Sequence, residues 1–122
     1  VREGNHVPVM GSLNRYRDLI YIDDVVDCWI LCLKNKSYTN EIYNLGSGKK
    51  SFIGEMINDI IYVENKVGKV KVEEVGATPG DLKGCFADIS KIKNNLGFKP
   101  QINLKEGLQK FKAWADEEYP LS

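Results

Sequence analysis

Residues 15–27 read Arg-Tyr-Arg-Asp-Leu-Ile-Tyr-Ile-Asp-Asp-Val-Val-Asp, and no other stretch of the 122-residue chain is as informative. The apolar residues 19–22 have the composition of a short β-strand. Asp23 and Asp24 follow and predict a helix start, because a short carboxylate can cap free backbone N–H groups. Arg17 stands at the entrance to the strand, where a guanidinium can bind an anion while the strand holds it in place.

This stretch resembles the RDFxYVDD motif of sugar-nucleotide epimerases and dehydratases. These enzymes are the extended branch of the NAD(P)-dependent short-chain dehydrogenase/reductase superfamily. Three further segments resemble family motifs in the family's order and at ordinary spacings, and together the four cover nearly the whole chain. Within the family the chain resembles UDP-glucose 4-epimerase-like members. Residues 41–48 resemble the YNxGxG strand and turn, residues 79–91 the RPGD…ADxSK stretch, and residues 96–108 the LGWxP…LxEGL ending.

The resemblance implies an α/β fold, namely the C-terminal fragment of such an enzyme, with the substrate lobe and the last elements of the Rossmann-type sheet. Family members hold the dinucleotide on a Gly-rich turn near the start and carry a Ser/Thr and a Tyr-x-x-x-Lys before the RDxxYxDD motif. Residues 1–14 contain neither. We therefore expect residues 1–122 to be a substrate-binding portion, with NAD bound by a missing N-terminal part and with no catalytic or cofactor-binding residue on this chain.

The composition is that of a soluble globular protein, at 43% hydrophobic and 28% charged residues. Lys+Arg and Asp+Glu are both 17, so the formal net charge of zero gives no reason to expect a nucleic acid or an acidic membrane as partner. The apolar runs are too short to span a bilayer, and no signal peptide is visible.

The cysteine count is three, and an odd count without a secretory signal favours a reducing compartment, so a cytoplasmic location is expected. Cys28 and Cys32 are four residues apart on one face of a predicted helix, where we interpret both as buried small hydrophobic side chains. A metal site is not expected, because His6 is the single histidine and no second Cys pair has ligand spacing.

Hydrophobic periodicity predicts an alternation of helices and strands. Ser51 and Asp88 are predicted helix caps, and Gly97 is predicted to end a helix. Extended segments are expected at residues 7–10, 19–22, 42–45 and 69–75, and helices at residues 24–33, behind Ser51, at 88–96 and at 104–118.

The helix predicted at residues 24–33 is apolar on nearly all faces, so we expect it to be buried on more than one side. The strand at residues 42–45 belongs, by the resemblance, to a sheet whose other strands are missing. Unpaired edges and apolar faces recruit other chains. The isolated chain is therefore expected to self-associate or to pair with the missing N-terminal part.

Arg17 is the strongest candidate for a binding residue. The resemblance implies that it binds the diphosphate of a nucleoside-diphosphate sugar, and a guanidinium makes bidentate bonds to phosphate oxygens. The alternative is an ordinary salt bridge to Asp18 or Asp23. Arg15 lies two residues away and can assist, or it can simply be solvated.

Asp81 matches the acid that holds the ribose hydroxyls in the family, and a loop cap is the alternative. Thr78 stands where the family usually has an arginine before Pro-Gly-Asp. A threonine donates a neutral hydrogen bond and cannot neutralise a diphosphate. Either Arg17 and Arg15 bind the anion alone, or the base and phosphates sit differently.

Two further candidates follow from the resemblance. Met10 falls where the family places a residue against the nucleobase, and a thioether can lie on a ring face, with core packing as the equal alternative. Cys85 matches a position that lines the hexose pocket of 4-epimerases. Its small side chain would leave room for a 2-acetamido group.

Three patterns are set aside. Tyr62 and Lys66 have Tyr-x-x-x-Lys spacing, but they follow the residue 15–27 motif instead of preceding it. The turn at residues 46–51 lacks the third glycine of the dinucleotide fingerprint and the Walker spacing. Asp23 and Asp24 suggest paired acid/base carboxylates, but adjacent acids at a helix start are more often a cap.

Two classes of function are consistent with the sequence. The first is the nucleotide-sugar-binding portion of an NAD-dependent nucleoside-diphosphate-sugar 4-epimerase, inactive without the missing part, with a nucleotide-sugar 4,6-dehydratase as the alternative enzyme. The second is a non-catalytic fragment or complementing subunit that acts as an interaction module.

Overall fold

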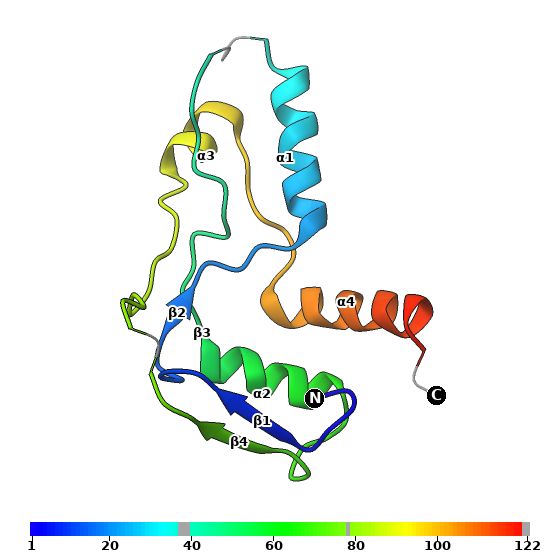
Figure 1. Ribbon diagram of the computed structural model, residues 1–122. Coiled ribbons are helices and arrows are strands. Elements are labelled where there is room, and N and C mark those ends of the chain that lie inside the picture. Colours follow the sequence, from blue (N-terminus) through cyan, green and yellow to red (C-terminus); the bar gives the residue numbers. More distant parts are fainter. Residues whose placement is uncertain (37–39, 78, 121–122) are drawn as a thin grey trace.

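The structure is a computed structural model and describes residues 1–36, 40–77 and 79–120 (Figure 1). Its mixture of short strands and helices is the α/β class that the sequence predicts. In chain order the elements are β1 (His6–Val9), β2 (Tyr16–Arg17), α1 (Ile22–Lys34), β3 (Ser51–Phe52), α2 (Ile53–Val63), β4 (Lys71–Glu74), α3 (Ser90–Leu96) and α4 (Leu104–Glu118).

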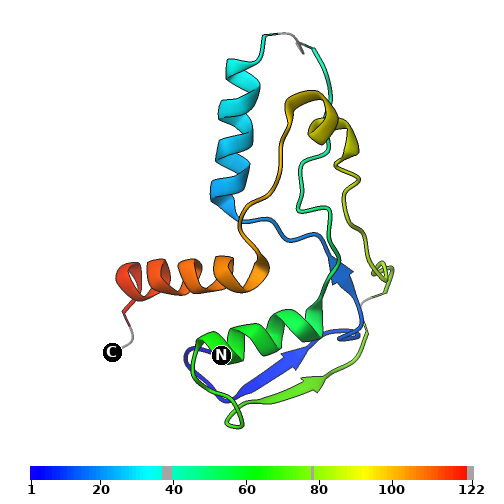
Figure 2. The ribbon, with the colours of Figure 1, turned by 180° about the vertical axis from the view of Figure 1, so that it is seen from behind.

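The described strands form two small sheets. β1 and β4 are parallel, with Val7 opposite Val72, and β2 and β3 are antiparallel, with Arg17 opposite Ser51. Figure 1 shows β1, β4 and α2 together in one half of the chain and α1 and α3 together in the other. The view from behind shows the same division, with β2 where the halves join (Figure 2).

Each half has its own hydrophobic core. Between α1 and α3 the buried residues are Cys28, Ile92, Leu96 and Phe98. Between α2 and the β1–β4 sheet they are Val9, Ile57 and Ile61. Neither core extends across the junction, where β2 pairs with β3 and the Tyr16 ring packs against Phe52 and Phe86, with ring centroids 5.7 Å and 6.4 Å apart.

Two predicted strands are absent from the described chain. Residues 19–22 do not form a strand, because β2 ends at Arg17 and α1 already begins at Ile22. Residues 42–45 are extended but unpaired, and the Ile42 side chain is 86% exposed. Both segments lack a neighbouring strand among the described residues, and a strand needs one to satisfy its backbone groups.

The predicted cap of α1 is also wrong. Tyr21 occupies the N-cap position without a side-chain cap bond. Asp24 is 2% exposed, and its carboxylate accepts the N–H groups of Gln101 at 2.8 Å and Ile102 at 3.1 Å. Asp24 therefore connects the first turn of α1 to the segment that precedes α4.

The other helix ends agree better with the sequence. Ser51 belongs to β3, and Phe52, not Ser51, is the N-cap of α2. The Asp88 carboxylate accepts the N–H of Ser90 at 2.9 Å. Asp88 lies one residue before the N-cap position of α3. Gly97 ends α3 with a φ of 70°, as predicted.

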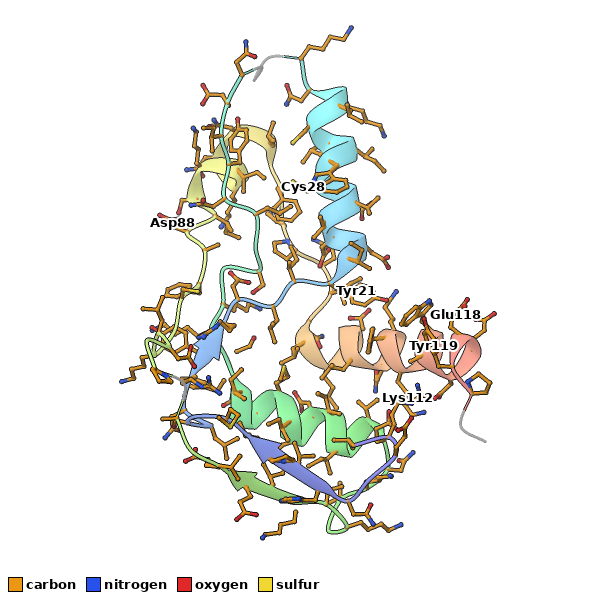
Figure 3. The ribbon with its side chains drawn as sticks, viewed as in Figure 1. Tyr21, Cys28, Asp88, Lys112, Glu118 and Tyr119 are labelled. Atoms are coloured by element: carbon orange, nitrogen blue, oxygen red, sulfur yellow. The ribbon has the colours of Figure 1, made fainter. Side chains whose placement is uncertain are left out.

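Helix α1 is less buried than predicted. Cys28 faces α3 and is buried, whereas Cys32 is exposed, so the interpretation of both as buried side chains holds for Cys28 only (Figure 3). Burial, together with the neighbouring Cys32 thiol, raises the pKa of Cys28 to about 11. Trp29 and Leu33 are 62% and 81% exposed, because among the described residues only one side of α1 is covered.

Candidate functional site

Three of the predicted site residues, Arg15, Arg17 and Asp81, come together at the junction of the two halves. β2 holds Arg17, and the segment containing Asp81 runs beside β2. The Tyr16 N–H donates to the Lys83 carbonyl at 3.1 Å, and Tyr16 also forms an isolated β-bridge with Gly84. These backbone bonds explain why residues more than sixty positions apart in sequence meet at one point.

The Asp81 carboxylate lies between the two guanidinium groups. Arg17 Nη2 donates to Asp81 Oδ1 at 2.8 Å, and Arg15 Nη1 donates to Asp81 Oδ2. The bond and charge of Arg15, reinforced by Arg17, hold the pKa of Asp81 below its usual range despite partial desolvation. Asp81 therefore remains an anion at neutral pH, with both oxygens engaged.

Both arginines are also oriented by backbone carbonyls. Arg15 Nε donates to the Ser12 carbonyl at 3.0 Å, and another Arg15 nitrogen donates to the Met10 carbonyl. Arg17 Nη1 donates to its neighbour Tyr16 at 2.8 Å. Guanidinium groups fixed in this way lose little further freedom when they bind an anion.

The salt-bridge alternative for Arg17 named the wrong partners. Asp23 pairs with Lys110, at 3.6 Å between Oδ2 and Nζ. Asp18 points its carboxylate at backbone N–H groups instead of at Arg17. The partner of Arg17 is Asp81, which the sequence offered only as a separate candidate.

A cavity of about 370 Å³ opens beside Arg15 and Asp81. Met10 and Cys85 are not among the residues that line it. Both side chains are exposed, and Met10, at 56% exposure, is packed in neither core. Thr78 lies outside the described residues. The lining consists of Gly11, Ser12, Asn14 and Arg15 from one segment and Ala77, Asp81 and Lys83 from the other.

Asp18 is the residue whose role the sequence reasoning missed. Its carboxylate accepts the Ser47 N–H and hydroxyl, both at 2.6 Å, and the N–H groups of Gly48 and Ala87, both at 3.0 Å. Burial raises the pKa of Asp18, but the bonds from Ser47, Ala87 and Gly48 outweigh it and hold the pKa below its ordinary value. The sequence feature that points to this role is the position of Asp18, next to Arg17 and directly before the apolar residues 19–22.

The glycine turn next to Asp18 does not fit a dinucleotide pyrophosphate. The N–H groups of Ser47 and Gly48, which would face phosphate oxygens in such a turn, already bond to Asp18. A Cβ at Gly46 would lie 2.6 Å from Asp18 Oδ2, so the carboxylate fills the cradle. This turn therefore holds a side chain of the protein.

The residues with Tyr-x-x-x-Lys spacing engage separate partners. Lys66 Nζ donates to the carbonyls of Val1 and Arg2, each at 2.9 Å. The Tyr62 ring lies 3.9 Å from the ammonium of Lys105. These partners, Val1, Arg2 and Lys105, do not belong to the Arg15–Asp81–Arg17 cluster.

The described residues contain neither a metal-binding group of side chains nor a membrane-spanning helix. No group of three or more His, Cys, Asp and Glu side chains there is arranged to hold a metal ion. Nor does any helix in that part of the chain have the length and apolar character needed to cross a membrane.

Comparison with known proteins identifies the family. The family model of GDP-mannose 4,6 dehydratase matches residues 1–111. UDP-glucuronate 4-epimerase of Thermodesulfobacterium geofontis is 37% identical over 123 residues, covering 99% of this chain and 36% of the relative. dTDP-glucose 4,6-dehydratase of Shigella flexneri is 27% identical, with 92% of this chain and 32% of the relative covered.

Solved structures show the same kinship. UDP-glucuronic acid 4-epimerase of Bacillus cereus, in complex with UDP-glucuronic acid and NAD, is 26% identical with a TM-score of 0.81, covering 92% of this chain and 35% of that one. dTDP-glucose 4,6-dehydratase of Bacillus anthracis, in complex with NAD, is 25% identical with a TM-score of 0.81, covering 96% and 36%.

The chain spans about a third of the length of the curated relatives it matches. The relatives include both 4-epimerases and 4,6-dehydratases. With 111 matched residues and the shared fold, the family and fold class predicted from the sequence are confirmed. The chain belongs to the GDP-mannose 4,6-dehydratase family, within the extended short-chain dehydrogenases/reductases that act as epimerases and dehydratases of nucleotide sugars.

Proposed function

We propose that residues 1–122 form the nucleotide-sugar-binding portion of an NAD-dependent nucleoside-diphosphate-sugar epimerase of the 4-epimerase type. The observation that carries the proposal is the pairing of Asp81 with both Arg15 and Arg17 beside an open cavity. A carboxylate between two guanidinium groups marks a place where an anion is bound in fixed geometry. A diphosphate also offers pairs of oxygen acceptors that can take two N–H bonds from a guanidinium group.

Each residue has a defined part in this proposal. Arg17 and Arg15 bind the diphosphate, and Asp81 turns toward the ribose hydroxyls when the phosphates take over its guanidinium partners. Met10 is assigned to the nucleobase and Cys85 to the hexose, where its small volume would admit a 2-acetamido group. Binding energy from these remote groups positions the sugar for chemistry elsewhere in the protein.

We assign NAD to a dinucleotide-binding part outside these residues. The occupied glycine turn supports this assignment. The exposed side of α1 supports it too, because Trp29 and Leu33 form an apolar face that such a part would cover. A second apolar surface is a groove of about 690 Å³ between residues 19–23 and α4, and such a part would cover it too. We also propose a cytoplasmic location, which the odd cysteine count supports.

Light scattering tests this assignment of partners. The isolated chain should self-associate with rising concentration, and co-expression of a dinucleotide-binding part should give a defined complex. A single monomer mass at every concentration, with slow amide exchange at residues 42–45, would show that the chain completes its own core.

A 4,6-dehydratase is the second candidate, because the matching family model is that of GDP-mannose 4,6 dehydratase. The two reactions have different products from the same class of substrate. Incubation of the whole protein with UDP-glucuronic acid, dTDP-glucose and GDP-mannose separates them, since a dehydratase loses water and an epimerase conserves mass.

Calorimetric titration with UDP, dTDP and GDP tests the binding site. Arg17→Ala should weaken the preferred diphosphate by one to two orders of magnitude, because a charge-assisted bond is worth about 1.5–3 kcal/mol. Arg17→Lys should restore only part of the affinity, since an ammonium lacks the bidentate fork. Lys71→Ala, which removes an exposed ion pair with Glu73, is the matched control. Equal affinity for wild type and Arg17→Ala would reject the site.

A further inference from the structure

A further basic side chain faces the cavity beside Asp81. Residues 83 and 84 run alongside Tyr16, whose N–H donates to the Lys83 carbonyl at 3.1 Å. Asp81 and Lys83, two residues apart in this segment, both line the same cavity of about 370 Å³.

Gly84, the residue that follows Lys83, packs directly against β2. A Cβ at Gly84 would lie 2.5 Å from the Tyr16 ring, so this residue faces β2. Only a residue without a side chain fits that approach, which keeps the register of the segment fixed. The register in turn keeps Lys83 on the side of the cavity.

The Lys83 side chain is exposed and has no bonding partner among the described residues. Among the described residues, its ammonium has no hydrogen bond, ion pair or aromatic ring within interaction distance. Other lysines near the site are engaged: Lys50 lies over the Tyr16 and Phe86 rings, at 4.9 Å and 5.1 Å from their centroids. An unpaired ammonium on a cavity wall is free to bind a ligand anion without breaking an existing bond.

The charges of the cluster leave a need for such a cation. Asp81 neutralises one of the two guanidinium charges of Arg15 and Arg17, so the three groups together carry a single positive charge. Both phosphates of a nucleoside-diphosphate sugar are ionised at neutral pH. The ammonium of Lys83 supplies the second positive charge that matches them.

We propose that Lys83 binds the diphosphate of the nucleotide and sets the preference of the site for diphosphates over uncharged nucleosides. The proposal rests on the function proposed above and adds a residue to it. Lys83 takes the part that a neutral Thr78 cannot fill. Arg15 and Arg17 then bind the anion from the segment that contains β2. Lys83 binds it from the segment that runs beside β2.

The test is a calorimetric titration of the whole protein with UDP, dTDP or GDP, whichever binds most tightly, and with the corresponding nucleoside. Lys83→Ala should weaken the diphosphate about tenfold, as expected for a charge-assisted bond, and leave the nucleoside unchanged. Lys83→Arg should retain most of the affinity, because it keeps the charge. Lys69→Ala, an exposed lysine next to β4, is the control and should change neither.

The outcomes separate this proposal from the function on which it rests. If Arg17→Ala weakens the diphosphate and Lys83→Ala does not, the function stands and the role of Lys83 is rejected. If Lys83→Ala weakens the diphosphate and its nucleoside equally, Lys83 shapes the pocket and does not bind phosphate, and the proposal is again rejected. If no diphosphate binds to the wild-type protein, both proposals fail. Equal melting temperatures for the variants exclude misfolding as the cause.

Discussion

Asp18 and Asp81 are carboxylates that flank β2, and they are held in opposite ways. Asp18 accepts three backbone N–H groups and the Ser47 hydroxyl, all contributed by turns of its own fold. Among the described residues, Asp81 accepts only from the side chains of Arg15 and Arg17. A backbone donor cannot turn away from its acceptor without a change of fold, whereas a guanidinium can exchange one anion for another.

The hydrogen-bond donors around each carboxylate separate a structural acid from one in a binding site. Both have a lowered pKa, so the pKa alone does not distinguish them. The identity of the donors does. We expect mutations at Asp18 to act on stability and mutations at Asp81 to act on ligand binding.

The largest expected effect comes from Asp18→Ala. The change leaves the N–H groups of Ser47, Gly48 and Ala87 without their acceptor, and the free energy of unfolding should fall by about 3 kcal/mol. Urea denaturation of the whole protein measures it. Asp81→Ala is the comparison and should cost clearly less stability; an equal loss for both would remove the distinction.

Gly46→Ala should disturb the Asp18 region from the other side. The new Cβ would lie 2.6 Å from Asp18 Oδ2 and 2.8 Å from the Ala87 Cβ. We expect a loss of about 2 kcal/mol from this overpacking, measured by the same denaturation. Gly4→Ala is the matched control, because a Cβ there meets nothing within 4 Å. If the two variants are equally stable, the turn is looser than the structure shows.

Asp81→Asn sharpens the comparison at the binding site. The amide is a weaker partner for Arg15 and Arg17, so inorganic pyrophosphate should bind more tightly to the freed guanidinium groups. The nucleoside should bind about tenfold more weakly, because the acceptor of the ribose hydroxyls loses its charge. Calorimetry with both probes measures the split. A loss of affinity for both probes would mean that Asp81 orients the arginines and does not compete for them.

The smallest expected effect is on the decline of the free energy of unfolding at acidic pH. The pKa of Asp18 is lower in the folded than in the unfolded protein, so the unfolded state binds protons first as the pH falls. The contribution of Asp18 is complete above about pH 4, the ordinary Asp pKa, and is lost as the pH falls through the lowered value. Asp18→Asn should flatten this decline, measured by urea denaturation at a series of acidic pH values.

The sequence predicted the helices better than the strands. Helices α2 and α4 follow from their own apolar periodicity, and Gly97 marks a helix end through its own backbone preference. Residues 42–45 were expected to be a strand because they have β-forming side chains. Pairing depends on a neighbour, which local sequence does not supply.

The sequence predicted which residues belong to the site but not which hydrogen bonds and ion pairs they form. Motif resemblance selected Arg15, Arg17 and Asp81, and the structure brings all three together. The pairing itself depends on the β-bridge between Tyr16 and Gly84, which no local pattern encodes. Lys83 was missed for a related reason: a loop lysine looks solvated until the fold shows that it lines the same cavity as Arg15 and Asp81.

Asp24 also has a consequence for the order in which the chain folds. Its bonds to Gln101 and Ile102 close loops of 77 and 78 residues, a long separation for a small protein. Contacts of such range carry a large entropic cost and form late, after the helices on either side exist. The bonds of Asp24 would then be absent from the folding transition state, and their removal would accelerate unfolding while leaving the refolding rate nearly unchanged. A single buried carboxylate would thus act as a latch, determining how long the completed fold persists and not how quickly it is reached.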